Sequence, residues 1–430
     1  MMKILMIILA FNFILIIHEL GHFIVAKLSK IRVDEFSLFV GPKLFSITRG
    51  ETTYSIRLFP ILAYVKMEGE DEESDSENAF YKKPVWVRAA VIAAGPLANI
   101  ISALVIITIF YSISGFQTTH VGEVVNNSPA YTSGIRTGDE IVEYDNKRVY
   151  QPMDFLQFLY ISKGEPTEVK VKRGDEILEF HLEPEVKPSE KRFMLGFSPS
   201  GDETNIVGNV TKGGPGDLAG LKAEDKILEL NDTEVASIDD IKNILQENRD
   251  KQLEITVERG GELVVLQATP KEDTTMEQYF IGMGFEYVKG GFLASLKQGV
   301  LFAYCNTRNV AYTLSWLVTG KATFADMMGP VGIVSTMNDA VQSTTTWLDA
   351  VMKILELTAF ISVAVGATNL IPFPALDGSK LVLLAVEAVR RKPIPIEKEA
   401  IITTIGFFIL IGFSIFISIN DFARLFGFNF

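Results

Sequence analysis

The segment His18-Glu19-Leu20-Gly21-His22 holds two imidazoles and one carboxylate at a spacing that suits metal-assisted hydrolysis. On a helix, side chains at i and i+4 project from one face, so both imidazoles can bind one zinc ion. The glutamate between them can take a proton from a water molecule that the metal activates. The spacing therefore predicts His18 and His22 as zinc ligands and Glu19 as the general base.

The surroundings of this motif strengthen the prediction. His18, Glu19 and His22 are the only ionisable residues in an apolar run from Ile4 to Ala26, which is long enough to cross a membrane. A charge at the centre of such a helix costs roughly 2.5–3.5 kcal/mol, so ionisable residues there indicate function. A chance match and a secretory signal peptide are the alternatives, but no small-x-small cleavage site follows the run.

Catalytic zinc needs a third protein ligand and keeps a position open for water. Asp377 is the best candidate, at the end of the segment Asn369-Leu-Ile-Pro-Phe-Pro-Ala-Leu-Asp-Gly378. The two prolines should break a helix within the membrane, which is tolerated only beside protein or water. Asn369 is expected to hydrogen-bond the substrate or the developing oxyanion. The plainer alternatives are that Asp377 marks a helix end and that Asn369 only packs.

Composition limits the class of protein. The chain has 430 residues, of which 48% are hydrophobic and 22% charged, so a membrane body plus one or two soluble domains fits. The net charge of −13 argues against nucleic acid as a partner. Cys305 is the only cysteine, so no intrachain disulfide is possible, and a packed thiol is the usual role of such a residue.

Apolar runs and the segments between them outline the membrane body. Four runs are long enough to span: Ile4 to Ala26, Ala89 to Phe116, Leu357 to Leu376 and Ala400 to Asn420. We therefore expect an N-terminal membrane region at 1–117 and a C-terminal one at 351–430. Alternating apolar residues and turn signals predict a membrane-associated β-loop at about 33–68. Residues 290–350 are expected to form amphipathic helices along the membrane surface.

The distribution of basic residues predicts an orientation. Lysines and arginines gather after the first run, before the second, and between the third and fourth. The positive-inside rule places those loops in the cytoplasm. Both termini and the large central region then lie outside.

The central region contains an internal repeat. Residues 128–141 align without a gap to residues 214–227, matching Pro129 with Pro215, Gly134 with Gly220, and Asp139 with Asp225. Each block precedes a turn candidate, a short helix and a strand pair, which indicates two duplicated domains. The pattern resembles PDZ domains, here in tandem at 118–184 and 204–270. They would bind extended peptides by strand addition or act as inert spacers.

The two motifs, in this order and with this topology, resemble the site-2 protease family, in particular bacterial RseP-type intramembrane zinc metalloproteases. Gly95-Pro-Leu-Ala-Asn99 and Gly329-Pro-Val-Gly-Ile333 are also similar to family signatures. The resemblance covers essentially the whole chain. It implies a multi-span α-helical membrane protein with four transmembrane helices, a membrane-associated β-loop and two α+β PDZ domains.

The resemblance also implies an activity. Such enzymes cleave transmembrane segments of single-span proteins already trimmed by another protease, including anti-sigma factors and remnant signal peptides. It implies His18, His22 and Asp377 as Zn²⁺ ligands, Glu19 as base and Asn369 as a substrate contact. We expect a multi-pass protein of the bacterial cytoplasmic membrane, with extracytoplasmic PDZ domains that bind peptides or exclude bulky substrates. A membrane-anchored scaffold and a zinc transporter are the competing interpretations, although no inverted repeat supports transport.

Overall fold

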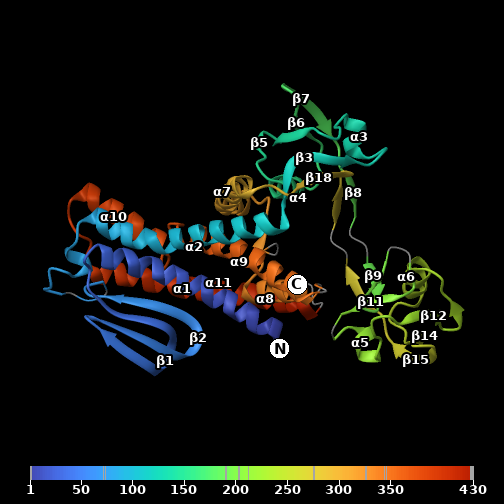
Figure 1. Cartoon of the computed structure of the whole chain (residues 1–430), viewed down its shortest axis with the longest axis horizontal. Coiled ribbons are helices and arrows are strands. Elements are labelled where there is room, and N and C mark those ends of the chain that lie inside the picture. Colours follow the sequence, from blue (N-terminus) through green and yellow to red (C-terminus); the bar gives the residue numbers. More distant parts are fainter. Residues whose placement is uncertain are drawn as a thin grey trace. The chain divides into compact units, whose positions relative to one another are not determined.

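The computed structural model describes residues 2–426 except 71, 73, 189, 190, 202, 203, 212, 275, 276, 325, 326, 343 and 345. It divides into two compact units. Unit 1 comprises Met1–Leu182 and Gly282–Phe430, and unit 2 comprises Glu183–Ile281 (Figure 1).

Unit 1 contains the membrane body. Within the described residues, four helices are long and apolar enough to cross a membrane, as expected from the sequence. They are α1 (Met2–Leu28), α2 (Val85–Ser114), α9 (Trp347–Asn369) and α11 (Ile396–Phe426). Helix α9 starts and stops earlier than the uncharged run predicted. Thr346 caps its N-terminus by accepting a hydrogen bond from the Asp349 amide, and Pro372 prevents its continuation.

Helix α2 is the centre of this body and packs against α1 and α9 (Figure 1). It also contacts α7 (Phe292–Val318) and α10 (Asp377–Arg390). One buried cluster joins Ala103 and Ile107 of α2 to Phe302 of α7 and Val363 of α9. Helix α8 (Pro330–Gln342) packs beside α1, α9 and α11.

The β-loop forms from two long strands, β1 (Val33–Arg49) and β2 (Thr52–Met67), beside α1. Both strands bend, so that residues 33–38 lie between residues 53–56 and residues 63–67. Among the described pairings, residues 63–67 pair only with 33–38 and therefore form an edge of the sheet. The base of the loop is buried with α1 and α2 through residues such as Val33 and Met67.

The first repeat lies in unit 1 and forms a sheet of order β18-β3-β4-β6-β7, with β5 beside β4. Its elements are β3 (Phe116–Val124), α3 (Pro129–Ser133), β4 (Glu140–Tyr144), β5 (Lys147–Arg148), α4 (Pro152–Ile161), β6 (Thr167–Arg173), β7 (Glu176–Leu182) and β18 (Met283–Val288). Strand β18 comes from beyond the second repeat, so residues 118–184 alone do not complete this sheet.

Unit 2 holds the second repeat, with a core that includes Ile227, Leu230, Ile255 and Val257. Its elements are β8 (Glu185–Lys187), β9 (Lys191–Met194), β10 (Phe197–Pro199), β11 (Val207–Val210), α5 (Pro215–Ala219), β12 (Lys226–Leu230), β13 (Thr233–Glu234), α6 (Ile238–Asn248), β14 (Leu253–Arg259), β15 (Glu262–Ala268), β16 (Lys271–Thr274) and β17 (Gln278–Phe280).

The repeats are nested rather than strictly in tandem. In the first repeat, the Val125 amide donates to the Gly282 carbonyl at 2.8 Å; in the second, the Thr211 amide donates to the Gly196 carbonyl at 2.7 Å. The first repeat thus takes this segment from downstream of its helix, and the second takes it from upstream. The matched blocks alone could not reveal this, because a local alignment carries no information about which distant strand fills a place in the sheet.

Candidate metal centre

Three expected metal ligands converge from two helices. His18 and His22 lie one turn apart on α1, and Asp377 opens α10. The Asp377 Oδ2 atom is 3.1 Å from His18 Nε2 and 3.5 Å from His22 Nε2, and the two Nε2 atoms are 3.3 Å apart. Two imidazole nitrogens and one carboxylate oxygen are the donor set of a catalytic zinc site with an open fourth position. The residues present therefore fit zinc.

The outer nitrogen of each imidazole faces a buried polar group on α2. His22 Nδ1 is 2.8 Å from the Val91 carbonyl oxygen, so Nδ1 carries the proton and Nε2 keeps a lone pair for a metal. His18 Nδ1 lies 3.4 Å from the side-chain amide of Asn99, which is fully buried. Turning the amide oxygen of Asn99 towards Nδ1 would satisfy that oxygen and give His18 the same tautomer.

Glycines let α1 and α2 approach closely at this site. A Cβ atom on Gly95 would lie 2.3 Å from His22 Nε2, and one on Gly21 would lie 2.3 Å from the Ala94 carbonyl oxygen. Both distances are too short for a real contact. A larger residue at either position would therefore push the imidazoles of α1 away from α2.

The segment between α9 and α10 carries Asp377 to the histidines. Pro372 and Pro374 keep it out of a helix, and Ala375 has a φ of +78°, an unusual value for alanine. Helix α10 is fixed to α2 by a buried ion pair in which the Arg88 guanidinium donates to both carboxylate oxygens of Glu387.

The five residues singled out from the sequence line one cavity of about 320 Å³. Glu19 and Asn369 face this space together with the three candidate ligands. Asn369 reaches it as the last residue of α9, across a non-helical segment from Asp377, and not by helical periodicity.

Further residues of this cavity were not singled out individually from the sequence. Tyr64, Val65 and Met67 of β2 line it, with Lys380 of α10 and Glu70, which form an ion pair at 2.8 Å. Their sequence context is ordinary. Asn99 was noted only as part of a family signature, although an amide in the middle of an apolar run is by itself unusual in a membrane helix.

Comparisons with known proteins identify a peptidase family and its relatives. The model of peptidase family M50 matches residues 6–413. The zinc metalloprotease RasP of Bacillus licheniformis is 31% identical, over 97% of this chain and 98% of its own. The regulator of sigma-W protease RasP of Bacillus subtilis is 30% identical over the same shares. A Clostridium perfringens protein, whose name includes the words zinc metalloprotease, is 29% identical over 98% of both chains.

The match extends over nearly the whole length of the chain and includes the segments that carry the histidines and Asp377. Together with the apolar helices on which these residues lie, it fixes the class of enzyme. The chain belongs to peptidase family M50, the site-2 protease family, and is a zinc metalloprotease of the membrane.

Proposed function

We propose that this enzyme cleaves the transmembrane segments of single-span membrane proteins, such as trimmed anti-sigma factors or remnant signal peptides. One observation carries the proposal: the candidate zinc ligands and Glu19 lie on and between helices that are apolar enough to cross a membrane. A peptide bond cut there must come from within the membrane. The name of the Bacillus subtilis relative, a regulator of sigma-W protease, favours a membrane-bound regulator of a sigma factor among the substrates.

Each of the five residues singled out from the sequence has a role in this proposal. His18, His22 and Asp377 would hold zinc, which when bound would act as a Lewis acid towards water and the scissile carbonyl. Glu19 takes a proton from the attacking water and passes it to the leaving amide nitrogen. Asn369 donates a hydrogen bond from its side-chain amide to the oxygen on which negative charge develops.

We expect the edge of the β-loop to bind the unwound substrate. A peptide bond inside a helix is masked by the helix's own hydrogen bonds, so the substrate must unwind and find new partners. Residues 63–67 form a sheet edge, and three of them line the cavity that holds the candidate ligands. An unwound substrate can pair with that edge as an added strand.

The position of the chain in the cell is a further part of the proposal. We place it in the bacterial cytoplasmic membrane, with the two repeats as extracytoplasmic PDZ domains that exclude substrates with bulky outer domains. A phosphatase fused near residue 200 should be active and one fused at residue 395 inactive. The reverse pattern would overturn this orientation.

Cleavage by purified protein tests the activity. We expect wild type, and not Glu19→Gln, to cut a single-span substrate whose outer domain has been trimmed. Both proteins should contain equal zinc, because Glu19 is not among the proposed ligands. His22→Ala should lose zinc and cleavage together. Turnover by Glu19→Gln at the wild-type rate would contradict the role of Glu19, and absence of zinc from wild type would contradict the ligand set.

Disulfide cross-linking tests the proposed strand pairing, because the chain has a single cysteine, Cys305, that can be replaced beforehand. In a Cys305→Ser, Glu19→Gln background, a cysteine is placed at Val65, on the edge beside the cavity. The matched control places it at Ile47, in the segment on the opposite edge of the same sheet. A substrate cysteine near the scissile bond should form a disulfide with position 65 and not with 47. Equal yields at both positions would argue against pairing at this edge.

A further inference from the structure

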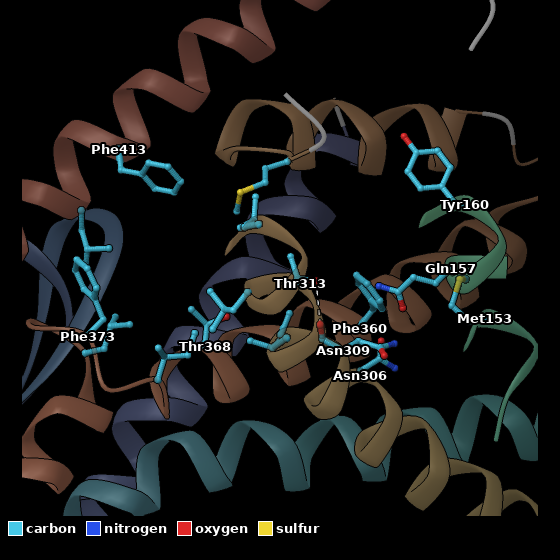
Figure 2. A pocket seen from close by; sticks show the side chains of 18 of the residues that line it. Met153, Gln157, Tyr160, Asn306, Asn309, Thr313, Phe360, Thr368, Phe373 and Phe413 are labelled. Carbon is cyan, nitrogen blue, oxygen red and sulfur yellow. Dashed lines mark hydrogen bonds between the residues drawn. The ribbon is translucent and has the colours of Figure 1, made fainter. Parts of the chain in front are cut away.

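Unit 1 contains a second and larger cavity, of about 840 Å³. Its walls come from α4, α7, α9, the segment before Asp377, and α11 (Figure 2). Most of the lining side chains are aliphatic or aromatic. Packed protein interiors hold few voids larger than a water molecule, so a space of this size in a membrane body must be filled by lipid or by another chain.

Helix α11 is held to the rest of unit 1 at two separate points, and residues between those points line the cavity. Near its start, a Cβ atom on Gly406 would lie 2.2 Å from the Cβ atom of Pro374, which shows how closely the two backbones approach. Near its end, the buried Asp421 carboxylate accepts hydrogen bonds from the Gly329 and Gly332 amides at 3.2 and 2.7 Å. Phe413 lies between these points and lines the cavity (Figure 2).

The larger cavity shares a wall with the candidate metal centre. Thr368, Ile371, Phe373 and Leu376 line the larger cavity, whereas Asn369, Ala375 and Asp377 line the smaller one. These residues alternate within one short stretch of chain. An occupant of the larger cavity therefore lies one backbone segment away from the candidate zinc ligands.

A row of polar side chains distinguishes between lipid and protein as occupant. Asn306, Asn309 and Thr313 of α7 line the otherwise apolar space (Figure 2). The Thr313 hydroxyl donates to the Asn309 backbone carbonyl, but the Asn309 side-chain oxygen Oδ1 is buried without a hydrogen-bond partner. A buried acceptor left unpaired is unfavourable. A lipid tail has no donor to offer it, whereas a helix with a polar side chain does.

We infer that this cavity receives the transmembrane helix of a substrate before cleavage, and that the Asn309 side chain turns into the cavity to accept a hydrogen bond from a polar side chain of that helix. The inference rests on the proposed function. From this position, the substrate helix unwinds, and its scissile segment moves past residues 368–377 to reach the zinc ligands. Because Asn309 has a fixed place on α7, it selects helices with a donor at the matching depth.

Photo-crosslinking tests the docking. In Glu19→Gln protein in bilayers, the photoreactive amino acid p-benzoylphenylalanine replaces Phe413, which faces the cavity, or Phe408, which is 68% exposed on the same helix. The probe is a single-span helix with one serine at mid-span. We expect position 413 to cross-link this helix several-fold more than position 408. Cross-links to phospholipid only, or equal yields at both positions, would overturn the inference.

Kinetics test the role of Asn309. For the serine-containing substrate, Asn309→Leu should raise KM about tenfold with little change in kcat, which is the effect of losing one hydrogen bond from a neutral donor. For the same substrate with leucine in place of serine, the variant should match wild type. An equal change with both substrates would contradict selection by Asn309.

A variant that fills the larger cavity provides a third test, and its outcome distinguishes this inference from the proposed function. Ala364→Trp puts a bulky side chain into the cavity from α9 and should raise KM, while bound zinc stays the same. Normal KM for Ala364→Trp in a wild type that cleaves would overturn the docking site and leave the proposed function standing. A wild type that cleaves no single-span helix would remove both.

Discussion

The two repeats share their local architecture and differ in what covers one helix. In each repeat an arginine of the strand pair binds a buried aspartate: Arg173 binds Asp139, and Arg259 binds Asp225, both with an Nε–Oδ1 distance of 2.7 Å. Both also donate to an equivalent carbonyl, that of Gly134 or Gly220. The turns at Asp145-Asn146 and at Asn231-Asp232 each have two residues of positive φ. The duplicated sequence therefore reproduces a duplicated set of contacts.

The two repeats differ in the contacts made by the aspartate at the start of their longer helix, which is α4 in the first repeat and α6 in the second. Asp154 of α4 and Asp240 of α6 both accept hydrogen bonds from backbone amides just before the helix. Asp240 is partly exposed, and its other partner is the Ser237 hydroxyl. Asp154 is fully buried and binds Arg308 of α7 at 2.7 Å.

The environment of Arg308 shows how α7 holds the first repeat. Its guanidinium lies over the rings of Tyr150, Phe158, Tyr304 and Tyr312, at 5.1 to 5.9 Å from their centres. Cys305, one turn earlier on α7, donates its thiol to Asp154. In the second repeat, Asp240 only caps the start of α6. In the first repeat, Asp154 caps α4 and also binds α7 of the membrane body.

The largest effect should follow from removing the anchor charge. Asp154→Asn leaves the Arg308 guanidinium, which is 14% exposed, without its ionic partner. Breaking a buried pair in this way costs about 3–5 kcal/mol. Asp240→Asn, the matched change in the second repeat, should cost much less, because Asp240 is partly exposed and water solvates its neighbours after the change. Thermal unfolding of the purified protein measures both, and equal losses would contradict the comparison.

The Cys305 thiol reports directly on the same contact. Burial, and next the charge of Asp154, raise the pKa of this thiol to about 12. At pH 8 its thiolate population should be roughly a thousandfold below that of a free cysteine. Maleimide labelling should therefore be very slow in wild type and in Asp240→Asn, and faster in Asp154→Asn. Rapid labelling of native wild type would show that α7 does not stay on α4.

The shared aspartate–arginine pairs should respond alike. Arg173→Gln and Arg259→Gln each remove hydrogen bonds to a carboxylate that is buried, with an expected cost of about 2 kcal/mol in either repeat. Hydrogen exchange followed by mass spectrometry can compare the strand pairs β6–β7 and β14–β15 within one protein. A loss confined to one repeat would mean that the two clamps are not equivalent.

Acid should produce the smallest effect. Burial alone would raise the pKa of Asp225, but hydrogen bonds from Arg259 and from the Lys222 amide hold it below its ordinary range; Asp139 is lowered in the same way by Arg173 and the Arg136 amide. Each pair therefore contributes its full stability above the unfolded pKa of about 3.9 and loses it as the pH falls through the lower folded pKa. In Arg259→Gln the loss should begin at higher pH in unit 2 only, as judged by hydrogen exchange.

The accuracy of the predictions from sequence differs between the membrane helices and the repeats. Sequence reasoning placed the apolar helices well because composition and length suffice for them, although Pro372 and the Thr346 cap moved the ends of α9. It found the turns and the helix of each repeat from matched blocks. The sequence did not predict that β18 belongs to the first repeat, because the residues of a strand do not specify which sheet the strand joins.

The candidate site shows the same division. His18, Glu19 and His22 follow from helical spacing alone, and Asp377 and Asn369 follow from a motif with two prolines. All five line one cavity. Lys380 was not foreseen, Asn99 was noted only within a family signature, and residues 63–67 were noted only as part of the β-loop, since each enters the site through the packing of a different element.

By itself, the sequence determined what can be read along one helix or one short motif: the membrane helices, the paired imidazoles with their glutamate, and the existence of a repeat. Only the tertiary structure decided which distant groups meet. It brought Asp377 to the histidines, nested one repeat within the other, buried Asp154 under Arg308, and left a large cavity beside α11. The reason is physical: helical periodicity is set by local backbone geometry, whereas contacts between separate elements depend on how whole surfaces pack.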